Sequence, residues 1–348
     1  MDEELILSDV HVFLDKKECI SKYGKHEESR KYISRFYFKN IDNRLMIDHD
    51  AEDLFNNVKD IEFDEDGDQI ISRSSSYQLL FLTLEHSMET ILANVGEQVW
   101  LGSFFMGDFL LNFGNDILVK RNVLELGCGT GMCGIIAGIF ADKVYCTDIG
   151  CATLDICRCN IERNQELYNY LLMKKELPDI FVKKLDWSES GEKYICDYDV
   201  FRAIFKLSNG LLKEICWNLE KEDLEELFNT DILIAADVIY QENITDDFFA
   251  TVMKLMMNGK SKVLYLSLEK RINFTLHAMD VVAPAYQYFL DWLSELSSTD
   301  SKWVAKRITT MFEKYFDYNR VPQLVSFDFC IESKMQISNK NKRQVKGI

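Results

Sequence analysis

A glycine-dense segment at 123–137 has the residue types and spacing of a nucleotide-binding turn. Apolar residues lead into Gly127, Gly129 and Gly131, and an apolar run with a helical pattern follows. Glycines let the backbone approach a ligand without a Cβ in the way, and the first N–H groups of the next helix can face a polar or anionic group. The segment predicts the strand, turn and helix that begin a nucleotide-binding α/β unit.

Two classes of ligand fit the glycine spacing. Gly129, Gly131 and Gly134 match G-x-G-x-x-G, the fingerprint of dinucleotide-binding proteins. Glu125, taken with Gly127, Gly129 and Gly131, matches E-x-G-x-G-x-G, the form found in S-adenosylmethionine-dependent methyltransferases. The same glycines would also suit tight packing of a strand against a helix. The ligand therefore has to be chosen from the rest of the chain.

Asp148 ends the next predicted strand, close to the offset of about 20 residues at which an acidic residue meets ribose hydroxyls in nucleotide-binding folds. A carboxylate suits this role because it accepts hydrogen bonds from both hydroxyls of a diol. It would also repel a 2′-phosphate, which disfavours NADP. The alternative is that Asp148 is the N-cap of the following helix.

Two further groups of side chains follow predicted strands. Asp186 could accept a hydrogen bond from an adenine amino group while Trp187 packs against a flat ring; the alternative is a capping aspartate beside a core tryptophan. Asp237 and Tyr240 follow a buried strand. Because open parallel sheets bind ligands at the carboxyl ends of their strands, we expect these side chains and the glycine turn at one edge.

The elements that must position these residues alternate between strand and helix from residue 121 onward. This alternation predicts a parallel sheet covered on both faces, an α/β fold of the Rossmann-like type, closed by a final pair of strands. The predicted strands are 32–39, 77–84, 123–126, 143–147, 181–185, 231–236, 262–268, 303–308 and 324–330. The predicted helices are 104–113, 132–140, 153–164, 246–257 and 278–296.

The chain divides into three predicted regions. Residues 1–75 form an N-terminal extension that contains strands and an acidic loop, residues 76–335 form the α/β domain, and residues 336–348 form a basic tail. Residues 188–229 are predicted to be an insertion between strands, with an acidic helical segment at 220–226.

Composition narrows the partners. With a net charge of −17 and a pI near 4.8, the chain is expected to attract a basic protein or peptide rather than nucleic acid. The acidic start at Met1 gives no signal-peptide pattern, and no apolar run is long enough to cross a bilayer, so we expect a soluble protein.

The cysteines do not have the spacing of a zinc site. Of ten cysteines, six lie within 128–159, and Cys157-x-Cys159 lacks the second cysteine pair that such a site would need. We expect small, buried, reduced thiols and no metal site.

Taken together, the motifs resemble those of the seven-strand protein lysine methyltransferases of the methyltransferase-like group. The resemblance covers residues 78–330, apart from an insertion near 188–216, and is poor over the first 75 residues beyond a short match at Ser8-Asp9-Val10-His11-Val12. It is carried by Val99-Trp100, Glu125–Gly131, Thr147-Asp148, Leu185-Asp186-Trp187 and Asp237–Tyr240, and more narrowly by 95–100, 144–148 and 267–276.

The resemblance implies binding of S-adenosylmethionine and transfer of its methyl group to the ε-amine of lysine in a non-histone protein. It also implies a location in the nucleus and cytoplasm and a nucleic-acid-binding protein as substrate; we expect a monomer. By this resemblance, the methionine part of the cofactor is lined by Glu125, Gly127 and Gly129, in the motif that Gly131 completes. The ribose is held by Asp148 and the adenine by Asp186 and Trp187, while Trp100 closes over the cofactor. The lysine channel is shaped by Asp237 and Tyr240.

Two other functions stay open at this point. The first is an NAD-dependent oxidoreductase, which Gly129, Gly131, Gly134 and Asp148 would suit, although the sequence offers no convincing partner for hydride transfer. The second is a non-catalytic cofactor-binding scaffold that acts through its N-terminal extension. Trp100 is open in the same way, because periodicity does not separate a core tryptophan from one that touches a cofactor.

Overall fold

A seven-stranded sheet forms the centre of the protein, which we describe from a computed structural model. The structure describes residues 5–8, 10, 20–21, 31–39, 79–172, 178–188, 221–275, 280–298 and 303–331. The predicted acidic loop, most of the predicted insertion, the basic tail and the proposed boundary at residue 75 lie outside these residues.

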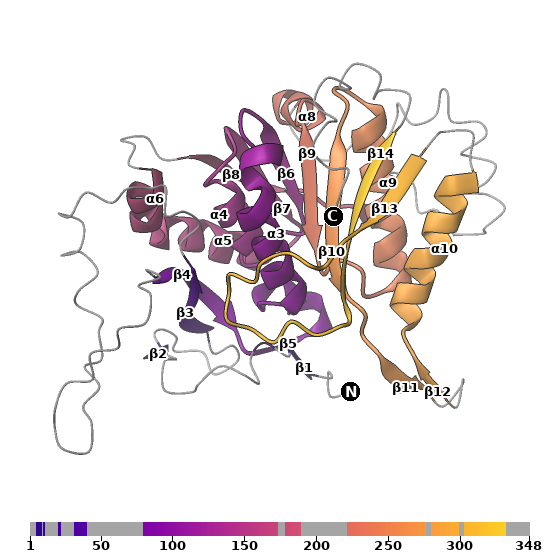
Figure 1. The fold of residues 1–348 in the computed structure, drawn as a ribbon, viewed down its shortest axis with the longest axis horizontal. Coiled ribbons are helices and arrows are strands. Elements are labelled where there is room, and N and C mark those ends of the chain that lie inside the picture. The colour runs from indigo at the N-terminus through magenta and orange to yellow at the C-terminus, as the bar shows by residue number, and fades with distance from the viewer. Residues whose placement is uncertain are drawn as a thin grey trace.

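The strand order confirms the predicted α/β fold. The sheet runs β13-β14-β10-β9-β6-β7-β8 (Figure 1), in which β6 to β10 are parallel and β14 pairs antiparallel with both β10 and β13. The chain builds outward from β6 in one direction and then returns to place β9 on its other side. The order therefore reverses between β6 and β9, where parallel sheets bind ligands. The strands are β6 (Asn122–Leu126), β7 (Lys143–Asp148), β8 (Asp179–Lys184), β9 (Ile232–Ala236), β10 (Val263–Glu269), β13 (Trp303–Ile308) and β14 (Leu324–Ile331).

Helices cover both faces because the central strands carry apolar side chains on both faces. In β9, Ile232 and Ile234 join one core and Leu233 joins the other, as expected when successive side chains point to opposite faces. The first core contains α3 (Leu101–Ile117), α4 (Met132–Ala137), α5 (Cys151–Arg163) and α6 (Gln165–Leu172); the second contains α8 (Lys221–Phe228), α9 (Glu242–Met257) and α10 (Pro284–Ser298).

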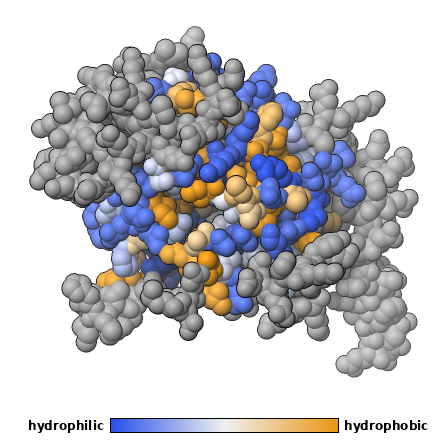
Figure 2. Space-filling view, turned by 180° about the vertical axis from the view of Figure 1, so that it is seen from behind, coloured by the Kyte–Doolittle hydropathy of each residue, from blue (hydrophilic) through white to orange (hydrophobic). Residues whose placement is uncertain are grey.

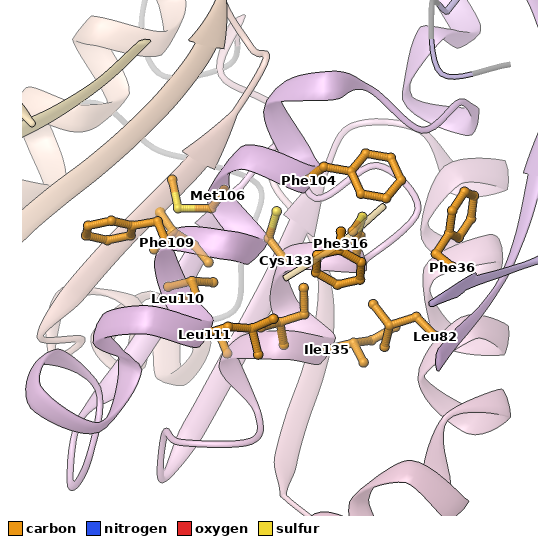
Figure 3. Close-up of a cluster of buried hydrophobic side chains, with 14 of the residues drawn as sticks. Phe36, Leu82, Phe104, Met106, Phe109, Leu110, Leu111, Cys133, Ile135 and Phe316 are labelled. Carbon is orange, nitrogen blue, oxygen red and sulfur yellow. The ribbon is translucent and has the colours of Figure 1, made fainter. Parts of the chain in front are cut away.

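A strand of the N-terminal extension, β3 (Lys31–Lys39), is part of the first core. Strand β3 pairs with β4 (Leu79–Ser87), and β3 also pairs with the short β2 (Ile20–Ser21). Figure 3 shows Phe36 of β3 turned toward Phe104 of α3, and their ring centroids lie 5.2 Å apart. The strand therefore contributes apolar side chains to the same core as the α/β domain.

A second small sheet lies before α3. Here β1 (Leu5–Leu7) pairs with β5 (Glu89–Ile91), which leads into a short 3₁₀ helix, η3 (Leu92–Glu97) (Figure 1). The predicted periodicities contained no signal for a strand as short as β1.

Two of the predicted helices are shorter than expected. The helix predicted at 278–296 begins only at Pro284, because proline suits the first turn of a helix and not its interior. Residues before it form β12 (Asp280–Val282), which pairs with β11 (Asn273–Thr275). The helix predicted to reach residue 140 ends at Ala137, where the N–H of Phe140 turns back to the Ala137 carbonyl in a tighter turn.

Hydrophobic side chains are also exposed. On the face seen in Figure 2, hydrophobic residues lie in the middle of the surface among hydrophilic ones. Within the described ranges, Met311 and Leu5 are among the most exposed large hydrophobic residues. Single exposed residues of this kind are usual on protein surfaces. No helix in the described part of the chain combines the length and the apolar character needed to span a membrane.

Candidate active site

The glycine turn after β6 requires backbone that only glycine adopts readily. Gly127, Gly129 and Gly131 have φ values of +71°, +52° and +84°. A Cβ on Gly127 would lie 2.8 Å from Val238 Cγ1, and one on Gly129 would lie 3.0 Å from the carbonyl oxygen of Gly96. The turn is therefore wedged between the segment after β9 and the segment before α3.

Asp148 lies at the end of β7 and is hydrogen-bonded to this turn. Its Oδ2 accepts from the Gly129 N–H at 3.0 Å, and its Oδ1 accepts from the Ile149 N–H at 2.8 Å. Burial raises the pKa of the carboxyl group, and these N–H donors oppose the rise. The residue predicted to bind ribose thus lies directly beside the glycine turn, and its role toward ribose stays a prediction.

We call residues 95–100 the wall segment, because they line the glycine turn from the side of α3. Trp100 precedes α3, and its Nε1 donates to the carbonyl of Val95 at 2.9 Å. The guanidinium of Arg271, just beyond β10, lies 4.4 Å from the centre of the Trp100 ring. Trp100 is half-buried. It has the position that closure over a cofactor would need, and that role stays a prediction.

Asp237 joins three elements. It follows β9 with a φ of +54°, and it is buried. Its Oδ2 accepts from the Gly102 N–H in the first turn of α3 at 2.6 Å, and its Oδ1 accepts from the Glu269 N–H at the end of β10 at 2.7 Å. Both oxygens are therefore engaged by backbone, so Asp237 fixes the geometry of this edge, and its predicted place in a lysine channel stays a prediction.

The pKa of Tyr240 is shifted by burial and by charged residues from two neighbouring segments. Burial raises the pKa of its hydroxyl to about 12, the negative charge of Asp148 adds to the rise, and Arg271 opposes it. The tyrosine therefore keeps its proton at neutral pH. It can donate a hydrogen bond and is not poised to accept a proton.

The contacts of Asp186 and Trp187 are those of a capping aspartate and a core tryptophan, the alternative to adenine binding. Asp186 Oδ1 accepts from the N–H and the hydroxyl of Ser188, at 2.9 and 2.6 Å, which is a capping-type contact. Trp187 packs edge-to-face on Phe248, with ring centroids 5.4 Å apart, and its ring would lie 3.3 Å from a Cβ on Gly127. Its Nε1 is buried and has no hydrogen-bond partner among the described residues. Adenine binding by this pair stays a prediction.

Glu125 lies beneath the glycine turn. It is buried, its Oε2 makes no hydrogen bond among the described residues, and burial raises its pKa well above the usual value. A Cβ on Gly134 would lie 2.6 Å from that oxygen, so Gly134 allows α4 to pack on the carboxyl group. The methionine contact predicted for Glu125 stays a prediction.

Thiols fill the space around Gly131. A Cβ on Gly131 would lie 2.7 Å from Cys157 Sγ, so this glycine is needed for packing against α5. Hydrogen bonds from the thiols of Cys128 and Cys146 lower the pKa of Cys157. The expectation of buried, reduced thiols holds for Cys128, Cys133, Cys146 and Cys157, which are buried and free, and is wrong for Cys151 and Cys159, which are free but exposed on α5.

The structure brings the glycine turn, Asp148, Trp100, Asp237 and Tyr240 to the carboxyl ends of the parallel strands. Asp186 and Trp187 lie at the same edge. The residues that motif reasoning did not single out are Gly96, which touches the glycine turn, and Arg271, which lies on Trp100. Both fall within the segments 95–100 and 267–276 that carry the narrower resemblance, which was their only signal.

This arrangement fits S-adenosylmethionine by its chemistry. Three alternate glycines with positive φ form a turn that neighbouring segments approach closely, and Trp187 borders this turn. The Asp148 carboxylate accepts a hydrogen bond from the turn, and Trp100 ends the wall segment that lies beside it. The orphaned Trp187 Nε1 and Glu125 Oε2 are further polar groups that a bound ligand or its ordered water could satisfy.

Comparison with known proteins gives a family and several relatives. Residues 81–204 match the family described as lysine methyltransferase. Methyltransferase-like protein 22 from Mus musculus is 31% identical over 72% of this chain, and its counterpart from Homo sapiens is 33% identical over 70%. The alignments cover 59% and 56% of those proteins, so this chain spans a little over half of their length.

More distant similarities exist as well. Protein N-lysine methyltransferase METTL21A from Xenopus tropicalis is 24% identical over 60% of this chain and 78% of that protein. Among solved structures, the O-methyltransferase from Bacillus cereus in complex with SAH aligns over 67% of this chain and 82% of that chain, with 13% identity and a TM-score of 0.35. The fold assignment depends on the strand order of this chain and not on that alignment.

Proposed function

We propose, from the match of residues 81–204 to the family described as lysine methyltransferase, that the protein transfers the methyl group of S-adenosylmethionine to the ε-amine of a lysine in a protein substrate. One observation carries the proposal. The glycine turn, Asp148, the wall segment and Asp237–Tyr240 meet where the strand order reverses. That is the position at which a parallel sheet binds a nucleoside-containing ligand.

The cofactor would be held by the turn and its neighbours. Gly127 and Gly129 would pass close to the methionine part, Asp148 would accept from the ribose hydroxyls, and Trp100 would cover the site. When bound, the cofactor supplies a methyl group already activated on a sulfonium, so the transfer needs no covalent enzyme intermediate. The work left to the protein is alignment of the amine nitrogen with that methyl group and removal of water.

The substrate amine has to arrive without its proton. Free lysine has a pKa near 10.4, so only about one amine in a thousand is neutral near pH 7.4. A partly apolar channel favours the neutral form, and the negative charge of Asp237 would attract the ammonium before the proton leaves to solvent. Tyr240, whose pKa is about 12, would orient the amine as a hydrogen-bond partner and not remove its proton.

The first test is cofactor binding by titration calorimetry. We expect the wild-type protein to bind S-adenosylhomocysteine and not NAD, and we expect Asp148→Ala and Gly129→Arg to abolish that binding while circular dichroism shows a retained fold. Asp155→Ala is the matched control, because Asp155 is an exposed residue of α5 that forms a surface ion pair with Arg158. Unchanged affinity in both site variants would rule out this pocket.

The second test is methyl transfer. The protein is incubated with a lysate and isotopically labelled S-adenosylmethionine, and modified lysines are identified by mass spectrometry. Labelled lysine that disappears with Gly129→Arg supports the enzyme over a non-catalytic scaffold. Cofactor binding without any labelled protein would favour the scaffold instead.

The substrate and the location are proposed from the resemblance alone. We propose a nucleic-acid-binding protein as substrate, a monomeric enzyme, and a distribution between nucleus and cytoplasm. The protein named by the labelling experiment tests the substrate, light scattering after size exclusion tests the oligomeric state, and a fluorescent fusion tests the location.

A further inference from the structure

We infer that residues 5–8 form part of the cofactor site by holding the wall segment in place, and that Ser8 is a positioning residue for it. The inference rests on the proposed function, since it concerns the same site. It assigns a role to residues 5–8, for which the motifs predict no site residue, although Ser8 begins the short match at 8–12.

Ser8 is bonded to the wall segment through both its backbone and its side chain. Its hydroxyl donates to the carbonyl of Val99 at 2.5 Å, and its N–H donates to Gln98 Oε1 at 2.9 Å. Ser8 is fully buried. Val99 directly precedes Trp100, so these bonds act next to the residue expected to cover the cofactor.

Gln98 completes the connection from the other side. It is buried, and its Nε2 donates to the carbonyl of Ile6 at 2.9 Å and to Thr90 Oγ1 at 2.7 Å. The Gln98 side chain therefore bonds once to Ile6 of β1, once to Ser8 just after β1, and once to Thr90 of β5. The wall segment is thus tied to a two-stranded sheet that the N-terminal strand completes (Figure 1).

Polar contacts, more than apolar burial, hold β1 at this place. Leu5 and Leu7 are 60% and 53% exposed, so their side chains bury little apolar surface. A three-residue strand gains little from the hydrophobic effect under these conditions, because that effect scales with the apolar area removed from water. The hydrogen bonds of Ser8 and Gln98 are what distinguish this strand from a fraying terminus.

The wall segment in turn sets the room at the cofactor site. The carbonyl oxygen of Gly96 would lie 3.0 Å from a Cβ on Gly129, and a Cβ on Gly96 would lie 3.7 Å from Asp148 Oδ2. A short 3₁₀ helix, the bond from Trp100 Nε1 to Val95 and the bonds from Ser8 to this segment define its path. A displacement of a few tenths of an ångström at Val99 would therefore alter both the space beside the glycine turn and the position of Trp100.

The test compares three serine variants of the full chain. We expect Ser8→Ala to raise the Kd for S-adenosylhomocysteine and the KM for S-adenosylmethionine by about threefold to tenfold, as the loss of one hydrogen bond predicts, with kcat changed by less than about twofold. Ser8→Thr, which keeps the hydroxyl, should restore at least part of the affinity. Ser34→Ala is the control, because it removes a buried hydroxyl of β3 that lies 2.8 Å from His86 Nε2.

A wild-type Kd in Ser8→Ala, with thermal stability lowered as in Ser34→Ala, would overturn the inference and leave Ser8 with a structural role only. Hydrogen exchange on the wild-type protein gives a readout that does not depend on a variant folding. S-adenosylhomocysteine should protect the Ser8 amide together with the amides of Gly129 and Trp100. Protection at Gly129 without protection at Ser8 overturns this inference, whereas no protection at Gly129 overturns the proposed function itself.

Discussion

At the scale of single residues, the candidate site uses carboxylates as acceptors for backbone N–H groups. Asp148 binds the glycine turn, and Asp237 binds the first turn of α3 and the end of β10. Each carboxylate therefore shapes the pocket before any ligand enters it. The same negative charges lie where a ribose and a lysine ammonium would approach.

Asp237→Ala should reduce both stability and methyl transfer. The change leaves two buried N–H donors without a partner, which costs about 2 to 5 kcal/mol of unfolding free energy. Methyl transfer should fall at least about tenfold more than the affinity for S-adenosylhomocysteine, because the carboxylate also faces the proposed lysine path. Denaturant melts, calorimetry and a methyl-transfer assay measure the three quantities. Equal losses of affinity and transfer would instead assign Asp237 to the cofactor side.

Tyr240→Phe should lower kcat by about tenfold and leave the pH profile unchanged in shape. With a pKa of about 12, Tyr240 is protonated throughout pH 7 to 9. The rise of activity with pH in that range then belongs to the substrate amine, whose neutral fraction grows tenfold per pH unit below its pKa. Initial rates at saturating cofactor check this. A profile that becomes flat in Tyr240→Phe would make the tyrosine a proton acceptor.

At the scale of elements, the central strands and the closing pair could be predicted from sequence, because their apolar runs and the glycine turn encode local structure. The parallel direction of β6, β7 and β9 followed from the alternation of strand and helix. What could not be predicted depends on contacts between distant segments. The N–H partners of Asp237 come from α3 and β10, and nothing in the residues near position 237 specifies them.

The short elements escaped prediction for a related reason. Strand β1 has three residues, two of them exposed leucines, and it exists because Ser8 meets Gln98 ninety positions away. Trp187 illustrates the limit at the site itself. Its indole could have packed in the core or on a ligand, and only the fold reveals its contact with Phe248.

The packing of β3 on β4 should give the protein an acid-sensitive stability. His86 is fully buried, its Nε2 lies 2.8 Å from Ser34 Oγ, and burial lowers its pKa to about 4, with the Ser87 carbonyl and Glu85 opposing the shift. The folded state therefore favours neutral His86. The contribution of His86 to the free energy of unfolding is complete above pH 6.5. It is lost as the pH falls from 6.5 to 4, and the total loss is about 3 kcal/mol.

Denaturant melts of the wild-type protein and of His86→Gln between pH 7 and pH 4 measure this effect. The two stabilities should differ most near neutral pH and converge toward pH 4, because the variant has no imidazole to protonate. Parallel curves over the whole range would show that His86 does not titrate in the unfolding transition.

At the scale of the whole molecule, one segment connects parts of the chain that are far apart in sequence. Residues 309–323, which we call the strap, lie between β13 and β14. Phe316 of the strap packs on Phe38 of β3 and on Phe104 of α3, with ring centroids 5.0 and 5.5 Å apart (Figure 3 shows Phe104 and Phe316). The strap therefore fixes the helix whose first turn is bonded to Asp237.

A buried ion pair secures the strap. The Arg320 guanidinium donates to Asp108 Oδ2 in α3, and fully buried Asp108 also accepts from the N–H groups of Tyr315 and Phe316. Burial raises the pKa of Asp108, and Arg320 is the first of the groups that oppose the rise. Removing one member of such a pair leaves a charge buried without its counter-charge.

Arg320→Met should lower the unfolding free energy by about 3 kcal/mol and weaken S-adenosylhomocysteine binding less than it weakens the fold. Lys314→Met is the matched control, because the Lys314–Asp317 pair on the same strap is exposed and should contribute less than about 1 kcal/mol. Thermal and denaturant melts of both variants compare them. Equal small effects would mean that the strap is held by its aromatic contacts alone.

The position of β14 in the sheet also has a consequence for synthesis on the ribosome. The ribosome has made the glycine turn, Asp148, Asp237 and β10 before it adds residue 324. Residues Leu264–Glu269 of β10 pair with β14, so β10 lacks this neighbour until β14 has been made. A nascent or prematurely terminated chain therefore exposes an open strand edge flanked by apolar side chains, the kind of surface that recruits other strands. Stop codons just upstream of Leu324 should consequently yield aggregates or chaperone-bound chains, even though every residue proposed to contact cofactor or lysine is present.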